Sequence, residues 1–436
     1  MTTIPQVARA MREILTTTAE EAARTTRFVQ RTSPLSGATF SQTLVFGFLG
    51  NPQATLEELA QTAAALGVEI SPQALDQRFT ASAAACLHQV LVSAIARVIT
   101  TEPVTIPLLQ RFPAVYVQDS STIVLPELFA AQWHGCGGST AAGTSAALKL
   151  QARLEMRTGR LDVQLQEGRA SDRAAVLPGP LPAGALRLAD LGYWSLGAFA
   201  ALAQHEVFWL SRLQMQTAVY DATGDRRALL ELLEAQPTDT IELAVTLGER
   251  ERLAARLLAV RVPQDVAETR RRRLRQAARD KGRQVSATRL ALAAWTIFVT
   301  NVPPERLALR EALVLGRMRW QIELLFKLWK SHGRVDETRS TKPWRILCEV
   351  YAKLLAMLVQ HWVFLVSCWA YPDRSLTKAA QTVQKHALHL ANAFARVKRL
   401  AEALLTVKRC LAAGCRMNRR KKHPNTYQLL LGATGP

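Results

Sequence analysis

The sequence lacks the spaced cysteine and histidine pairs that hold a structural zinc ion. Its six cysteines are scattered, and no cysteine pair with zinc-ligand spacing is backed by a second pair. We interpret them as reduced thiols of a cytoplasmic protein, most of them filling the core. They are Cys86, Cys136, Cys348, Cys368, Cys410 and Cys415.

The sequence also lacks an internal repeat, a low-complexity linker and a signal peptide, because no compact apolar stretch follows a basic start at its N-terminus. One apolar run, residues 354–371, is barely long enough to span a membrane, and Gln360 and His361 lie at its middle. We therefore predict that this run is a buried helix.

Acidic residues are few relative to basic ones. The chain has 35 Asp and Glu against 55 Lys and Arg, which gives a formal net charge of +20. A basic surplus this large and this widely spread predicts a polyanion partner, most simply DNA or RNA, although an acidic protein or a membrane surface would also fit. The 436 residues, 49% of them hydrophobic, are enough for about three domains with large cores.

Residues 1–103 are rich in Ala and Leu and predict helices. Within them, Thr55 to Phe79 has the rhythm of a helix-turn-helix, with Gly67 at the turn and Ser71-Pro72 opening the second helix. A plain helical hairpin would give the same pattern. If the second helix reads a DNA groove, it is expected to expose Gln73, Asp76, Gln77 and Arg78.

Alternating and β-branched runs predict strands after residue 104, followed by helices, which favours an α/β fold. The expected strands are 114–118, 147–156, 161–166, 186–189, 207–213, 241–247, 253–262 and 291–300. The expected helices are 195–204, 266–281 and those that follow Pro304.

Three acidic residues stand in contexts that favour metal-dependent chemistry on phosphodiesters. Asp119 and Asp190 each follow an apolar strand-like run, and Glu323 lies on a predicted helix. Two Mg²⁺ ions about 4 Å apart can activate a water and stabilise the leaving oxygen, and hard carboxylate oxygens suit Mg²⁺. Carboxylates that converge from distant segments of a basic chain therefore indicate a site that cuts nucleic acid.

Simpler interpretations exist for each acid. Either aspartate could only cap a turn, since Ser120 follows Asp119 and Gly192 follows Asp190. Four other acids lie close by in the sequence and compete for the same role. They are Glu127, Asp162, Glu167 and Asp172.

The helix around Glu323 is the most specific element. Arg319, Glu323 and Lys330 are spaced by four and seven residues, which places them within roughly 40° of one another on a helix. An Arg–Glu pair at this spacing is usually a surface ion pair. The apolar residues around the rest of this helix predict burial, so a charged stripe there calls for a function.

At these residues the chain resembles the DDE cut-and-paste transposases of insertion sequence family four. That family has its third acid in the pattern Y-x-x-R-x-x-x-E-x-x-x-x-x-x-K, which matches here except that Gly316 replaces the tyrosine. Its second acid has an Asp-Arg-Gly-Tyr context, matched by Asp190, Gly192 and Tyr193, with Leu191 in place of the arginine. The resemblance extends over roughly residues 70–370.

The resemblance implies a ribonuclease-H-like α/β core with a β-rich insertion between the second and third acids. The expected regions are a helical DNA-binding region (1–103), the core (104–221 and 301–372), the insertion (222–300) and a helical and basic tail (373–436). It implies a bacterial, nucleoid-associated homodimer that binds inverted-repeat ends and target DNA. The amphipathic segment 375–410 is expected to form the dimer interface.

The resemblance also implies two Mg²⁺ ions, replaceable by Mn²⁺, at Asp119, Asp190 and Glu323. Water would cut one strand, and the new 3′-hydroxyl would form a hairpin that is reopened before joining to target DNA. A nuclease that does not join ends, or a helix-turn-helix regulator without chemistry, stays open as an alternative. The expected DNA contacts are Arg319, Lys330, Trp295 (to a flipped base), Tyr193, Lys327 and Arg270, Arg271, Arg272 and Arg273.

The basic runs 270–275 and 416–422 are expected to add sequence-independent affinity for DNA that falls with salt, unless they are only solvated charged faces. Trp295 lies in an apolar run, where a tryptophan is more often part of the core.

Overall fold

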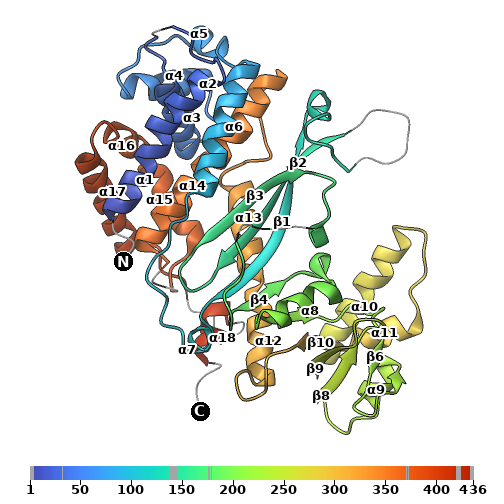
Figure 1. The fold of residues 1–436 in the computed structure, drawn as a ribbon. Helices are drawn as coiled ribbons and strands as arrows, with labels where there is room; N and C mark the ends of the chain where they lie inside the picture. Colours follow the sequence, from blue (N-terminus) through green and yellow to red (C-terminus); the bar gives the residue numbers. More distant parts are fainter. Residues whose placement is uncertain are drawn as a thin grey trace. The chain divides into compact units, whose positions relative to one another are not determined.

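The computed structural model describes residues 4–31, 33–136, 145–174, 177, 179–369, 371, 373–418 and 424–432. These residues fall into two compact units (Figure 1). The first contains the described residues of Met1–Thr105, Asp119–Pro178 and Trp320–Tyr427. The second contains those of Ile106–Gln118, Gly179–Arg319 and Gln428–Pro436.

The first unit is mainly helical, with a β-hairpin. Its N-terminal helices are α1 (Ile4–Glu13), α2 (Ala19–Thr25), α3 (Gly37–Gly50), α4 (Leu56–Ala65), α5 (Pro72–Asp76) and α6 (Ala81–Ala96). Its later helices are α13 (Trp320–Ser331), α14 (Pro343–Ser367), α15 (Leu376–Lys385), α16 (Ala387–Asn392) and α17 (Val397–Ala413). The predicted hairpin is confirmed, because β2 (Ala146–Glu155) pairs antiparallel with β3 (Leu161–Glu167).

Helix α14 is the centre of the first unit and packs against α3 and α6 (Figure 1). It is long and apolar enough to cross a membrane, but 94% of its most apolar window is buried inside the protein. The prediction of a buried helix at residues 354–371 is therefore confirmed for the part up to Ser367. His361 is buried, and its Nε2 atom forms a hydrogen bond of 2.8 Å with the backbone oxygen of Gly159.

The predicted helix-turn-helix is present, but its second helix is short. Gly67 has a φ of +82° between α4 and α5, and Ser71 caps α5 by accepting a hydrogen bond from the Ala74 amide. The prediction that the side chains of Asp76 and Arg78 are exposed is wrong. Asp76 pairs with Lys342 and Arg345, and Arg78 donates to Ser33 Oγ at 2.9 Å. Gln73 and Gln77 are exposed as expected.

The second unit is an α/β unit built on a mixed sheet. Its strands are the first four residues of β1 (Val115–Leu125), β4 (Leu186–Ala189), β5 (Phe208–Arg212), β6 (Val219–Tyr220), β7 (Arg226–Arg227), β8 (Thr240–Leu247), β9 (Leu253–Arg261) and β10 (Trp295–Thr300). Its helices are α7 (Pro107–Gln110), α8 (Leu196–Gln204), α9 (Leu229–Glu234), α10 (Gln264–Arg279), α11 (Ala287–Leu292) and α12 (Leu309–Met318). Helix α18 (Thr426–Gly432) lies near the end of the chain.

Strands β1, β4 and β5 run parallel, and α8 connects β4 to β5 as a parallel crossover requires. Strand β10 then pairs antiparallel with β5 on one side and β9 on the other, and the sheet continues through β8, β6 and β7. This confirms the expected α/β core with added β structure between residues 190 and 323. The core of the unit includes Phe199 stacked on Trp209 with ring centroids 4.5 Å apart.

One predicted strand begins too early. Residues 291–292 end helix α11, and strand β10 starts only at Trp295. The Ser286 side chain caps α11 by accepting from the Arg289 amide, and the alanine and leucine residues that follow favour a helix up to Leu292.

Candidate active site

Asp119 lies in the first unit, inside strand β1. Its Oδ1 atom accepts a hydrogen bond of 2.8 Å from the Ser120 amide. The prediction that the strand ends at residue 118, directly before Asp119, is wrong, because β1 continues to Leu125. The β-branched residues Thr122, Ile123 and Val124 explain the longer strand. The side chains change from buried at Gln118 to half-buried at Asp119, so the carboxylate lies where the strand emerges from the core.

Glu323 and Lys330 share helix α13, also in the first unit. Glu323 is half-buried in the first turn of α13. The helix dipole stabilises a negative charge at this end of a helix. Lys330 Nζ donates to the backbone oxygen of Thr122 at 3.1 Å and lies 3.9 Å from Asp336 Oδ2. Helix α13 is therefore attached to strand β1 three residues after Asp119.

Arg319 does not lie on the same helix as Glu323. Helix α12 ends at Met318 and α13 begins at Trp320, so Arg319 stands between the two helices and belongs to the second unit. The prediction that Arg319 and Glu323 share one helix is thus wrong, although the backbone at Arg319 keeps helical dihedral angles, with φ −50° and ψ −31°.

Asp190 lies in the second unit, directly after strand β4, as predicted. Its side chain is 50% exposed, and its Oδ1 atom is 3.9 Å from Arg319 Nη1. That separation is too long for a hydrogen bond, and an ion pair at this exposure contributes little to stability. The Asp190 carboxylate is therefore accessible to a cation, with an arginine beside it that could bind a phosphate.

The strand register leads directly to both aspartates. Gln118 of β1 and Ala189 of β4 are partners in a parallel ladder, and each is followed in the sequence by one of the two acids. Arg187 Nε donates to Gln118 Oε1 at 3.0 Å across the same two strands. The last residue of β4 is therefore paired with the residue of β1 that precedes Asp119.

Three of the competing acids are committed to ion pairs in the first unit. Asp162, 3% exposed, accepts from both Arg153 and Arg160 at 2.8 Å. Glu167 pairs with His134 and Arg169, and Asp172 pairs with Lys149. Since these carboxylates already neutralise cations, they are poor candidates for a metal site. Glu127 is exposed in the short 3₁₀ helix Glu127–Phe129.

Two aromatic residues expected to contact DNA are buried in the second unit. Tyr193 is 3% exposed, and the Arg187 guanidinium lies 5.8 Å from its ring centroid. Trp295 is 5% exposed in the core, and the Arg261 guanidinium lies 4.9 Å from its ring centroid. A contact of either ring with a base would require repacking, so these roles stay predictions. Lys327, on α13, is exposed as a DNA contact should be.

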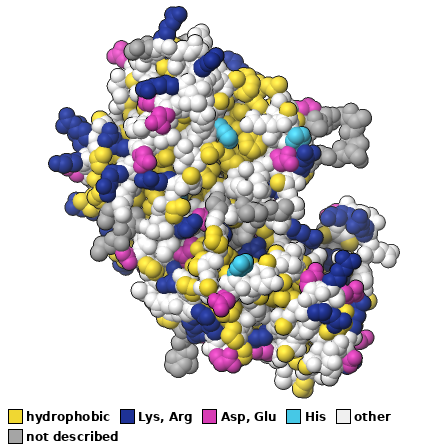
Figure 2. Space-filling model, viewed as in Figure 1, with side chains coloured by type: hydrophobic (Ala, Val, Ile, Leu, Met, Phe, Trp, Pro, Cys, Tyr) yellow, Lys and Arg dark blue, Asp and Glu magenta, His cyan; other side chains and the backbone are white. Residues whose placement is uncertain are grey.

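The arginines of α10 divide into two pairs. Arg270 is directed inward, where it donates to the Trp295 oxygen at 2.9 Å and to Thr296 Oγ1 at 3.0 Å, and burial lowers its pKa. Arg271 donates to the Leu290 oxygen at 3.0 Å. Arg272 and Arg273 are exposed. Figure 2 shows Lys and Arg side chains gathered over the part of the second unit that holds α10 in Figure 1.

The packing around position 316 explains why a glycine stands there. A Cβ atom there would lie 2.4 Å from Cζ of Phe298, so the phenylalanine ring of β10 occupies the space that any side chain at position 316 would need. Sequence reasoning identified Gly316 as a departure from the motif but had no signal for the residue that fills the space.

No group of three or more His, Cys, Asp or Glu side chains with metal-binding geometry occurs among the residues that the structure describes. Asp119, Asp190 and Glu323 nevertheless provide the donor chemistry that a divalent magnesium ion prefers, which is carboxylate oxygen. The donor set therefore fits Mg²⁺ better than it fits zinc, which favours nitrogen and sulfur.

The mixed α/β fold, with one large sheet and helices at both ends of the chain, is that expected of a DDE-type enzyme that acts on DNA. Residues 110–359, more than half of the 436-residue chain, match the family described as Transposase DDE domain. The chain therefore belongs to the DDE transposase family.

Curated relatives agree with this assignment along most of the chain. The transposase of insertion sequence element IS231F from Bacillus thuringiensis subsp. israelensis is 25% identical, over 98% of this chain and 94% of the relative. The transposase of IS1151 from Clostridium perfringens is 23% identical, over 79% and 77%. The putative transposase InsL of IS186A from Escherichia coli (strain K12) is 36% identical over 23% and 28%.

Replacing Gly316 by alanine should destabilise the second unit. The new methyl group would overlap the Phe298 ring, which costs about 1–3 kcal/mol and outweighs the gain of about 1 kcal/mol from alanine in a helix. Gly197 in α8 is a matched control, because a Cβ atom there would have no neighbour within 4 Å. The midpoint of thermal unfolding should be higher than wild type for Gly197→Ala and lower than wild type for Gly316→Ala. Equal midpoints for the two variants would show that Phe298 moves aside without cost.

Proposed function

We propose that this transposase cuts the inverted-repeat ends of a mobile element and joins them to target DNA with Asp119, Asp190 and Glu323 as its catalytic acids. The strand register is the observation that carries this proposal. Gln118 and Ala189 are partners in the parallel ladder, and Asp119 and Asp190 directly follow them in the sequence. Both acids supply the carboxylate oxygens that a divalent metal site requires.

The contact between Lys330 and Thr122 supports the inclusion of Glu323. Glu323 precedes Lys330 by seven helical residues, which span about 10 Å, and Asp119 precedes Thr122 by three strand residues, which also span about 10 Å. The contact between Lys330 and Thr122 therefore holds the helix that carries Glu323 against the strand that carries Asp119.

Asp119, Asp190 and Glu323 would hold two Mg²⁺ ions, or Mn²⁺ in their place. Bound there, the two ions would activate the attacking oxygen and neutralise the charge on the leaving oxygen. Arg319 beside Asp190 and Lys330 beside β1 would orient phosphates in the line of attack. Water would then cut one strand, and the freed 3′-hydroxyl would attack the opposite strand to form a hairpin that is later reopened.

The exposed arginines of α10 support a DNA-backbone surface on the second unit. Arg272, Arg273, Arg275 and Arg279 are exposed, and Lys281, Arg283 and Arg289 in the following segment are exposed as well. Such a surface binds phosphates without regard to base sequence and releases counterions. The other basic run, residues 416–422, falls largely outside the described residues, since 419–423 are not described.

We further propose that the enzyme works as a homodimer on bacterial DNA in the cytoplasm. Helices α15–α17 would supply the interface, because α17 is amphipathic and exposes Leu405 on its outer surface. A dimer would bring the two ends of one element together in a single complex.

Neutral isosteres of the three acids should abolish cleavage. Asp119→Asn, Asp190→Asn and Glu323→Gln each remove one metal ligand, so cleavage of end DNA in Mg²⁺ should fall by at least about a hundredfold. Binding of the same DNA should persist or improve, because a negative charge near phosphate is lost. Gel assays of cleavage and end binding measure both effects.

Glu127→Gln is the control, because Glu127 is exposed and is not assigned to the site. An acid whose variant cleaves at nearly the wild-type rate is misassigned. If the wild-type products contain neither a hairpin nor joined target DNA, the protein is a nuclease that does not join ends.

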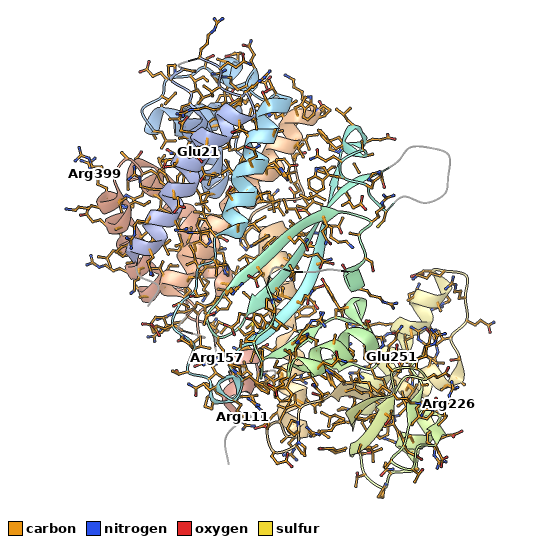
Figure 3. All side chains as sticks on the ribbon, in the orientation of Figure 1. Glu21, Arg111, Arg157, Arg226, Glu251 and Arg399 are labelled. Atoms are coloured by element: carbon orange, nitrogen blue, oxygen red, sulfur yellow. The ribbon has the colours of Figure 1, made fainter. Side chains whose placement is uncertain are left out.

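Removing Arg272 and Arg273 should weaken the part of DNA binding that comes from contacts with the DNA phosphates. For Arg272→Ala with Arg273→Ala, the slope of log affinity against log salt should become shallower by up to about two units, close to one for each lost phosphate contact. The control is Arg226→Ala with Arg250→Ala, which removes the same charge from exposed positions of the same unit. Arg226, labelled in Figure 3, lies on β7 and pairs with Glu249. Equal slopes for the two double variants would rule out a dedicated surface on α10.

A further inference from the structure

Helix α14 buries two opposite charges that its apolar packing does not need. Glu349 is 2% exposed and Lys353 is 1% exposed, one turn apart, with Lys353 Nζ 3.9 Å from Glu349 Oε2. Burial lowers the pKa of Lys353, and the nearby Glu349 opposes that shift. Apolar residues of similar volume often stabilise a protein as well as a buried ion pair does. The pair therefore calls for a role other than stability.

Both charges bind the segment that connects α13 to α14. We call residues 332–342 the α13–α14 connector. Lys353 Nζ donates to the backbone oxygen of Glu337 at 2.6 Å, and the Arg339 amide donates to Glu349 Oε2 at 3.4 Å. Glu349 also pairs with Arg345 in the first turn of α14 at 3.2 Å. The buried pair thus fixes the path of the connector from inside the unit.

The connector reaches back to the helix that carries Glu323. It leaves α13 through Gly333, where a Cβ atom would lie 2.6 Å from the Trp329 oxygen, and through Arg334, whose φ is +44°. Two residues further, Asp336 lies 3.9 Å from Lys330 Nζ, which donates to Thr122 of β1. A continuous set of contacts therefore runs from Lys353 through the connector and Lys330 to the strand that carries Asp119.

The N-terminal helices bind the same connector. Arg339 Nη1 donates to the Gln53 oxygen at 2.9 Å, and Gln53 Nε2 donates to Glu337 Oε2 at 3.3 Å. Asp76, at the end of α5, pairs with Lys342 at the end of the connector. The connector is thus held on one side by α14 and on the other by the helix-turn-helix region.

We propose that Glu349 and Lys353 are positioning residues for transposition, which hold the α13–α14 connector so that α13 keeps Lys330 and Glu323 in place against β1. This inference rests on the proposed role of Glu323 and Asp119. Neither Glu349 nor Lys353 needs to touch DNA or metal, because both act through Asp336 and Lys330.

The test replaces the pair with apolar residues. In this way an effect on the position of the connector can be told from an effect on the stability of the protein. Glu349→Leu with Lys353→Met leaves no unpaired buried charge, so the thermal midpoint and the affinity for end DNA should stay close to wild type. Single-turnover cleavage should nevertheless slow by about 10- to 100-fold, the usual effect of losing a residue that orients a metal ligand. The Mg²⁺ concentration for half-maximal cleavage should rise, and amide hydrogen exchange in residues 332–342 should become faster.

Arg153→Met with Asp162→Leu is the matched control. It removes another buried ion pair of the first unit, with side chains 7% and 3% exposed, and neither residue takes part in the connector contacts described above. Below its thermal midpoint, this control should cleave at the wild-type rate with an unchanged Mg²⁺ requirement. A control that slows as much as the α14 variant would mean that any lost buried pair impairs cleavage, and would overturn the proposal.

A milder variant keeps the test decisive if the α14 double variant does not fold. Asp336→Asn removes the negative charge that faces Lys330, and the Asp336 side chain is 33% exposed, so folding should be unaffected. It should slow cleavage and raise the Mg²⁺ requirement. Wild-type cleavage by Asp336→Asn, or by a folded α14 variant, would overturn the proposal. If Glu323→Gln also cleaves normally, the proposed function fails; if it does not cleave, only the positioning role fails.

Discussion

The parallel pairing of β1 with β4 is the constraint on which the proposed active site depends. The register that joins Gln118 to Ala189 is set by buried apolar residues on both strands, and a slip of one residue would turn every side chain to the opposite face. Core packing therefore fixes the positions from which Asp119 and Asp190 extend. The chemistry of the enzyme needs carboxylates at defined positions, and a sheet register is among the most rigid ways for a protein to provide them.

Glu323 depends on a different kind of constraint, because it comes from a helix far along the chain. Helix α13 is tied to β1 by Lys330, and its far end is held by a connector that buried charges on α14 fix in place. Lys330 thus has a structural contact in addition to any contact with phosphate. The same connector contacts the N-terminal helices, so the region that resembles a helix-turn-helix is bound to the segment that supports the third acid.

Much of the fold could be predicted from sequence because the signals are local. Strand β4 and the hairpin of β2 and β3 follow from alternation, and the caps of α4 and α5 follow from Thr55 and Ser71. The errors concern where elements begin and end. The strand before Asp119 was expected to end at residue 118, yet β1 continues to Leu125, and Arg319 stands before the helix that carries Glu323. The Phe298 ring that excludes a side chain at Gly316 left no local signal, and neither did the connector.

The most direct test of the account is whether one metal site reaches all three acids. Fe²⁺ in place of Mg²⁺, with ascorbate and peroxide, generates hydroxyl radicals that cut the protein backbone close to the bound ion. The account predicts cuts near residues 119, 190 and 323 that excess Mg²⁺ suppresses and that Asp190→Asn weakens at all three places. Cuts near only one or two of these segments, or cuts that survive loss of Asp190, would contradict it.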